Sequence, residues 1–111
     1  MSDAFEIVWA PAAIADLDDI VVYIAARECS ERAATVCLGI QDRVETLSSQ
    51  AYRGRVVPEL KDVGIQSFRE TLVAPYRIFF RIEGNAVWVV AVIDGRRDVG
   101  ALLVSRALQK K

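Results

Sequence analysis

The sequence predicts one α+β domain, in which an N-terminal strand and an antiparallel helical hairpin pack on a C-terminal antiparallel β-meander. Its 111 residues match the size of one ordinary domain, so residues 1–111 are assigned to a single domain with one core. Apolar residues recur at helical spacing through the first half of the chain. In the second half, segments rich in β-branched and aromatic residues are joined by short turns, which is typical of sequential antiparallel strands.

The chain is expected to begin with a strand and a helix. Residues 5–9 are rich in strand-forming residues and end before the Ala-Pro pair at positions 10 and 11. Pro11 suits the first turn of a helix, where its missing N–H costs no hydrogen bond. Apolar residues at steps of three, four and three then predict a helix over 11–28, with a stripe formed by Ile14, Leu17, Val21 and Ile24.

A second helix is predicted over 31–49. Ser30 is a suitable N-cap, and Glu31 carries a favourable charge in the first turn. Its apolar stripe consists of Ala33, Cys37, Ile40, Val44 and Leu47. Because the join between the two helices is only a few residues long, they should form an antiparallel hairpin. We expect the outer face of this hairpin to be acidic, with Asp16, Asp18, Asp19, Asp42 and Glu45.

The second half should consist of a loop, a three-stranded meander and a short helix. Glycines and Pro58 between residues 52 and 64 predict a loop that crosses from the helices to the sheet. The predicted strands cover 65–73, 76–83 and 86–94, and the Gly-Asn pair at 84 and 85 suits a two-residue hairpin turn. A closing helix is predicted over 99–109.

Alternation along the last two strands assigns their faces. The even positions of the second strand, Tyr76, Ile78, Phe80 and Ile82, form an apolar face suited to the helices. Its odd face carries Arg77, Phe79 and Arg81. The last strand is apolar on both faces, with Val87, Val89, Ala91 and Ile93 on one and Trp88, Val90 and Val92 on the other. The second face could be covered by the chain's own loop or C-terminal helix, or by a partner segment docking between arginines.

Charge is divided unevenly along the chain, although the formal net charge is only −1. Residues 1–50 hold three basic and nine acidic residues, and 3 − 9 gives −6. Residues 51–111 hold eleven basic and six acidic residues, and 11 − 6 gives +5. An anionic partner would therefore approach the later half and a cationic partner the earlier half. The alternative is two ordinarily solvated faces.

No metal or cofactor is expected. The chain has no histidine, and its two cysteines, Cys29 and Cys37, cannot alone complete a four-ligand zinc site. On one helix, eight residues at about 1.5 Å each separate the cysteines by about 12 Å, which is beyond the reach of a disulfide. We expect both to be small buried side chains. The absence of histidine also removes the commonest general base.

No membrane segment is expected either. The N-terminal residues lack the basic and apolar regions of a signal peptide, and no stretch approaches the roughly 20 apolar residues of a membrane span. A cytoplasmic location is the default expectation.

Four segments together resemble the ParE/RelE superfamily of bacterial toxins, and they span nearly the whole chain. They are residues 15–20 (ADLDDI), 54–60 (GRVVPEL), 73–84 (VAPYRIFFRIEG) and 89–98 (VVAVIDGRRD). The resemblance implies a RelE-like fold and the toxin role in a type II toxin-antitoxin module. It also implies a cognate antitoxin whose C-terminal segment wraps the toxin.

The two branches of this superfamily act differently. RelE-like members cut messenger RNA on the ribosome with basic residues of the sheet, whereas ParE-like members poison DNA gyrase and have no established catalytic constellation. The resemblance carries the RelE-type basic positions onto Arg69, Arg77 and Arg97. The position of the assisting tyrosine or histidine corresponds to Leu103, a lysine position falls near Thr71, and arginine alone is a poor general base.

We therefore expect a gyrase inhibitor rather than an enzyme. The long hairpin and the Gly-Arg-Arg-Asp run of residues 95–98 also resemble ParE and its plasmid-stabilisation relatives. An mRNA endonuclease, with the ribosome and messenger as partners, and a non-toxic member of the same fold remain the alternatives.

Residues predicted to bind the target or the antitoxin lie on and beyond the odd face of the second meander strand. They are Arg77, Phe79, Arg81, Trp88, Arg96 and Arg97. Two arginines beside an aromatic residue suit a peptide carboxylate or a phosphate, and the alternative is a solvated face. Arg96 and Arg97 could instead pair with Asp94 and Asp98. The two tryptophans, Trp9 and Trp88, are more typical of core or interface anchors than of platforms for bases.

Overall fold

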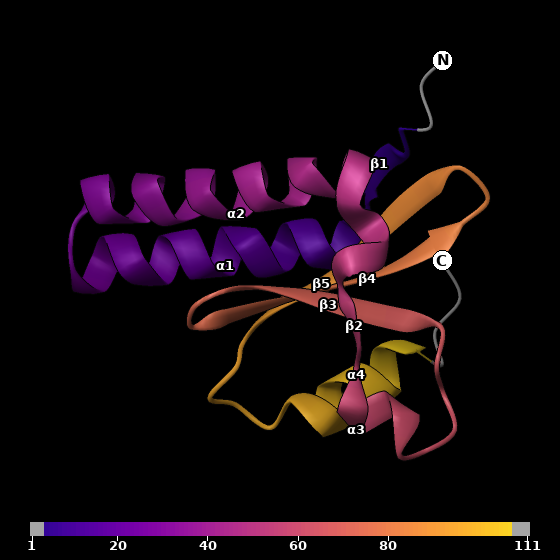
Figure 1. Cartoon of the computed structure of the whole chain (residues 1–111). Helices are drawn as coiled ribbons and strands as arrows, with labels where there is room; N and C mark the ends of the chain where they lie inside the picture. Colours follow the sequence, from indigo (N-terminus) through magenta and orange to yellow (C-terminus); the bar gives the residue numbers. More distant parts are fainter. Residues whose placement is uncertain (1–3, 108–111) are drawn as a thin grey trace.

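A computed structural model describes residues 4–107, which form three layers (Figure 1). The helical hairpin of α1 (Pro11–Arg27) and α2 (Ser30–Gln50) lies on one side of a five-stranded sheet. The short helices α3 (Pro58–Lys61) and α4 (Val99–Ala107) lie on the other side. The predicted α+β fold, with a hairpin packed on a meander and a closing helix, is confirmed. Residues 108 and 109 of the predicted closing helix lie outside the described residues.

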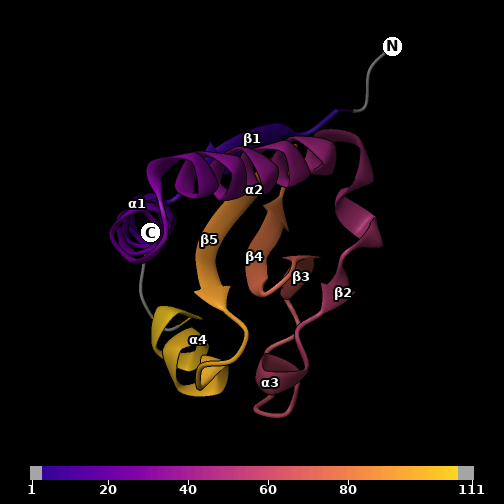
Figure 2. The ribbon, with the colours of Figure 1, turned by 90° about the vertical axis from the view of Figure 1, so that its left-hand side faces the viewer.

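The sheet has the strand order β1-β5-β4-β3-β2. Its strands are β1 (Glu6–Trp9), β2 (Arg55–Val56), β3 (Phe68–Val73), β4 (Tyr76–Glu83) and β5 (Ala86–Asp94). All neighbours are antiparallel except β1, which runs parallel to β5. The N-terminal strand therefore completes the sheet beside the last strand, and Figure 2 shows β1 passing behind α2 while β5 runs from α2 toward α4.

The helix boundaries lie close to those expected. Pro11 occupies the first turn of α1, and the helix ends where the Glu28 N–H donates to the Ile24 carbonyl. The N-cap of α2 is Cys29 rather than Ser30, because the link between the helices is shorter than predicted, and its Sγ accepts from the Arg32 N–H at 3.4 Å. None of the helices in the described chain is long and apolar enough to span a membrane.

Both cysteines are free, but they are not both buried as expected. Cys29 is exposed because it caps a helix at the tip of the hairpin, and Cys37 is half-buried against the core.

The predicted loop of residues 52–64 contains regular structure. A single 3₁₀ turn (Ala51–Arg53) follows α2, and β2 then pairs with β3. Pro58 begins α3 at a position where a helix tolerates proline. These elements are too short to produce periodicity in the sequence, and β3 itself begins at Phe68 rather than at residue 65.

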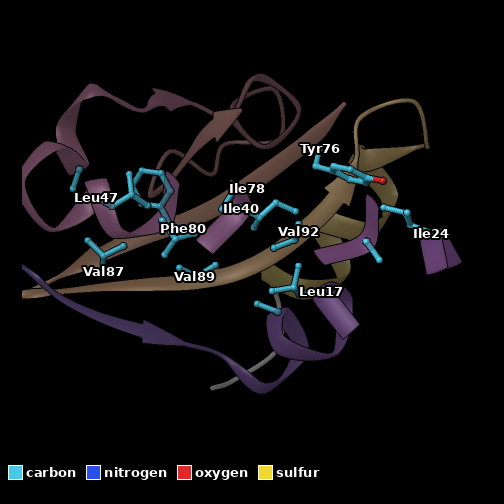
Figure 3. Close-up of a cluster of buried hydrophobic side chains, with 14 residues drawn as sticks. Leu17, Ile24, Ile40, Leu47, Tyr76, Ile78, Phe80, Val87, Val89 and Val92 are labelled. Atoms are coloured by element: carbon cyan, nitrogen blue, oxygen red, sulfur yellow. The ribbon is translucent and has the colours of Figure 1, made fainter. Parts of the chain in front are cut away.

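The first core lies between the hairpin and the sheet (Figure 3). The even positions of β4 point into it as predicted, with Tyr76, Ile78 and Phe80 buried and Ile82 partly buried. Helix residues meet them from both stripes of the hairpin, among them Leu17, Ile24, Ile40 and Leu47.

A second core lies on the opposite face of the sheet, where we expected no separate core. Its buried members are Val57, Leu60, Phe68, Phe79, Val90, Ala91, Ile93, Val99 and Leu103. The cover on the second face of β5 is thus the chain's own α3 and α4, so one of the two alternatives is settled.

A β-bulge changes the faces predicted for β5. Phe80 pairs with Val89 and Phe79 with Ala91, so Val90 is an extra residue in the ladder. Because side chains alternate, one extra residue moves every later side chain to the other face. Ala91 and Ile93 therefore join the second core, and Val92 joins the first, opposite to the prediction.

Candidate functional site

The predicted binding residues are divided between two regions. Four of them, Arg77, Phe79, Arg81 and Trp88, lie on the face of the sheet that carries the second core. The other two, Arg96 and Arg97, follow the C-terminal end of β5 and line a groove.

Arg77 is the centre of a buried ion-pair network. Its Nε donates to Glu70 Oε1 at 2.6 Å, and its two terminal nitrogens donate to both carboxylate oxygens of Glu59 at 2.7 and 2.8 Å. The side chains of Arg77 and Glu70 are only 11% and 4% exposed. Glu70 also accepts from Arg55 Nε at 2.5 Å. The positive charge of Arg77 is therefore balanced inside the protein, and little of it faces solvent.

The network shifts the proton affinities of its members. Hydrogen bonding from Arg77 holds the pKa of Glu59 below its ordinary value of 4.5, against an opposing effect of burial. The same bonds from Glu59 and Glu70 raise the pKa of Arg77 above its already high value. Arg77 is thus a fixed cation and cannot supply or accept a proton.

Phe79, Arg81 and Trp88 take part in the packing of the second core. We expected Phe79 on a face open to a partner, but it is fully buried because α3 and α4 cover that face. The Arg81 guanidinium lies 5.8 Å from the Trp88 ring centre and pairs with Glu83 at 3.0 Å. Trp88 is half-buried against the same core, which agrees with an anchoring role.

The RelE-type cations Arg69, Arg77 and Arg97 are not brought together. Arg69 pairs with Phe80, whose side chain enters the first core, whereas Arg77 pairs with Ile93 of the second core. Paired residues of antiparallel strands share a face, so Arg69 and Arg77 point to opposite sides of the sheet. Arg69 donates to the Gly54 carbonyl at 2.6 Å and stacks 5.4 Å from the Tyr52 ring centre. These cations cannot converge on one phosphate.

A groove of about 620 Å³ lies between α1, the C-terminal half of β5 and α4. Arg96 and Arg97 stand at one end of it. Arg96 donates to both carboxylate oxygens of Asp94 at 2.9 and 2.6 Å, which lowers the pKa of Asp94. Arg97 has no side-chain partner among residues 4–107. Of the two pairings considered for these arginines, only the one between Arg96 and Asp94 is therefore present.

An ion pair that the sequence did not suggest crosses the other end of this groove. Arg106 of α4 donates to both oxygens of Asp16 at 2.8 Å. Asp16 therefore does not lie on the outer acidic face of the hairpin, as we predicted, but is half-buried against β5. The partners are 90 residues apart, and no local pattern in the sequence could join them.

The fold and the groove define the class of protein. The chain is a small α+β domain with a helical hairpin on one face of its sheet, and its cleft is lined by paired charges and apolar side chains. A sequence model described as "ParE toxin of type II toxin-antitoxin system, parDE" matches residues 7–99. The chain therefore belongs to the ParE toxin family of type II toxin-antitoxin systems.

Comparison with solved structures supports the same fold. A chain of the chromosomal ParDE toxin-antitoxin system from P. aeruginosa superposes with a TM-score of 0.70 at 22% sequence identity. The alignment covers 84% of this chain and 98% of the other. None of the curated proteins compared with the sequence gives a significant match.

Proposed function

We propose that this protein is a toxin that inhibits DNA gyrase and is neutralised by a cognate antitoxin. Its membership of the ParE family supports the toxin role. The observation that favours a gyrase inhibitor over an mRNA nuclease is the position of Arg69 and Arg77 on opposite faces of the sheet. A nuclease of this superfamily would need its cations around one scissile phosphate.

The ion-pair network around Arg77 also favours a gyrase inhibitor over an mRNA nuclease. Two carboxylates hold its guanidinium inside the protein and accept from four of its five N–H donors, so little of its charge is left for a phosphate. The neighbouring cation, Arg55, is bound to the same carboxylate of Glu70, and Leu103, at the position of the assisting residue, is buried in the second core. Inhibition by binding requires none of these groups.

The antitoxin is the expected partner of such a toxin. The solved structure with the same fold comes from a ParDE toxin-antitoxin system. We infer that an antitoxin binds this chain too, and that the groove beside Arg96 and Arg97 is one of its docking surfaces.

The proposal is tested first by expression and then by supercoiling. Induced expression should arrest growth, and co-expression of the neighbouring antitoxin gene should restore it. Purified toxin should then inhibit supercoiling by gyrase, and addition of antitoxin should reverse the inhibition. Supercoiling that is unaffected by excess free toxin would contradict the gyrase target.

Two further outcomes separate the alternatives. Cleavage of ribosome-bound messenger, lost in an Arg97→Ala variant, would support an mRNA endonuclease in spite of the geometry. Expression without any effect on growth would favour a non-toxic member of the fold.

A further inference from the structure

One edge of β5 is only partly paired. β1 pairs with β5 from Glu6↔Ala86 to Trp9↔Val89, and the Ala10 N–H then donates to the Val89 carbonyl. Beyond this point α1 turns away from the strand direction, and no strand of the described chain lies beside residues 90–94 on that side. An unpaired edge of this kind presents backbone donors and acceptors that a further strand can use.

Side chains occupy the first two positions of this edge. The Val92 N–H donates to Asp16 Oδ2 at 2.9 Å, and the Val90 carbonyl accepts from Arg106 Nη1 at 3.0 Å. The ion pair of Asp16 and Arg106 thus offers one acceptor and one donor along β5, as a neighbouring strand would. Alternation places the Val92 carbonyl and the Asp94 N–H on the same edge, further into the groove.

The groove beside this edge has room and a defined chemistry. Its volume of about 620 Å³ adjoins a second hollow of about 470 Å³, and the two share four lining residues, Ile24, Glu28, Tyr76 and Arg96. Ile20 and Tyr23 of α1 and Leu102 of α4 supply apolar walls. These features suit an extended chain rather than a compact ligand, because the hollow runs along a strand edge.

Two charged side chains that line the groove have no ion-pair partner among the described residues. Asp16 pairs with Arg106, Asp94 with Arg96, and Glu28 with Arg32. Among the described residues this leaves Asp19 on α1 and Arg97 at the end of β5 as unpaired charges of the groove. A complementary segment would place an acidic side chain near Arg97 and a basic one near Asp19.

We propose that residues 90–94 of β5 form a strand-addition site for an extended apolar segment of the antitoxin, and that Arg106 and Asp16 occupy this edge in the free toxin. The segment carries an acidic residue that faces Arg97 and a basic residue that faces Asp19. This inference rests on the proposed function, because it takes an antitoxin as the partner.

Amide exchange tests the site directly. The probe is the antitoxin encoded beside the toxin gene, bound to the full chain, with exchange measured residue by residue. Addition of a strand should slow exchange of the Asp94 amide, which has no strand beside it in the free toxin. A complex in which antitoxin binds and the Asp94 amide exchanges at the free rate would overturn the strand-addition site while leaving the antitoxin proposal intact.

Charge variants test the complementarity. Arg97→Glu should weaken antitoxin binding by about 10-fold or more, as expected when a like charge faces a partner carboxylate. Arg53→Glu is the matched control, because Arg53 is an exposed arginine on the 3₁₀ turn outside the groove, and it should leave the affinity unchanged. Equal effects of both variants would indicate a general dependence on net charge and would contradict the inference.

A variant of Arg106 tests whether its side chain competes with the antitoxin for the edge of β5. Arg106→Ala frees the Val90 carbonyl in advance and leaves Asp16 without its ion-pair partner, so it should tighten antitoxin binding and speed exchange of the Val92 amide in the free toxin. Weaker binding, in a variant whose circular dichroism and melting are unchanged, would mean that Arg106 contacts the antitoxin and does not occupy the edge. A concentration-dependent dimer of the toxin that protects Asp94 would assign the edge to a second copy instead. Failure of any complex to form would overturn both this inference and the antitoxin proposal.

Discussion

The two faces of the sheet are covered in different ways. The hairpin covers one face with long helices whose apolar stripes fill the first core. On the other face, α3 has four residues and α4 has nine, and helices this short are marginal by themselves. The second core is bordered by the network of Arg77, Glu59 and Glu70, which ties α3 to two strands. Apolar packing therefore dominates under the hairpin, where Asp16 adds a polar contact to β5, whereas the ion-pair network fixes where α3 docks.

Phe79 and Phe80 provide the sharpest comparison of the two faces. These adjacent residues are fully buried on opposite sides of the sheet. Replacing either by alanine should lower the free energy of unfolding by about 3–5 kcal/mol, from lost burial and the cavity left behind. Exchange protection in α4 should fall more in Phe79→Ala, and protection in α2 more in Phe80→Ala. Identical exchange patterns in the two variants would show that both faces unfold as one unit.

Arg77 tests whether the charged network holds the second face. Arg77→Met leaves Glu70 buried with only the exposed Arg55 as partner, and should cost about 3 kcal/mol, the lower end for a broken buried pair, since Glu59 stays partly in water. Arg55→Met is the control, because Arg55 is 67% exposed, and it should cost less than about 1 kcal/mol. Chemical denaturation measures both. Equal losses would remove the special role of Arg77.

Two glycines near the first core should respond to alanine with opposite signs. A Cβ on Gly54 would lie 2.7 Å from the Phe80 Cζ and 2.9 Å from the Glu70 carbonyl oxygen, so Gly54→Ala should cost about 1–3 kcal/mol. A Cβ on Gly39, inside α2, meets only Val73 Cγ1 at 4.0 Å, so Gly39→Ala should stabilise the helix by about 0.5–1 kcal/mol. Melting temperatures that move in the same direction would contradict the packing around Gly54.

The smallest expected effect is a pH dependence confined to the second face. The pKa of Glu59 is lowered in the folded protein, so its ionisation stabilises the fold above its ordinary value of 4.5. That contribution is lost as pH falls below 4.5 and through the folded pKa. Glu59→Gln should therefore reduce stability at pH 7 by less than about 1 kcal/mol and flatten the acid limb of the stability curve. An unchanged acid limb would mean that Glu59 does not contribute.

Sequence reasoning predicted the regular elements well and the contacts between them less well. The hairpin and the three meander strands follow from periodicity and turn residues, which act locally. The bulge at Val90 leaves no local signal, because both faces of β5 are apolar, and the faces after it were therefore assigned wrongly. The short α3 was missed for a similar reason, since four residues cannot show a period.

The candidate site depended on contacts that join distant parts of the chain. Arg96 and Arg97 were recognised from a local motif, and the groove beside them includes both. Arg77 was also recognised, but its network with Glu59 and Glu70 requires the register of β3 and β4, which a sequence alone leaves open. The pair of Asp16 and Arg106 was invisible for the same reason.

The parallel pairing of β1 with β5 has a consequence for biosynthesis. Glu6 pairs with Ala86, and 86 − 6 gives a separation of 80 residues. While the ribosome is still making the middle of the chain, the hairpin has been synthesised but the strands that bury its apolar stripe have not. The nascent chain therefore cannot complete its fold until β5 has been synthesised, because only then can β1 pair with β5.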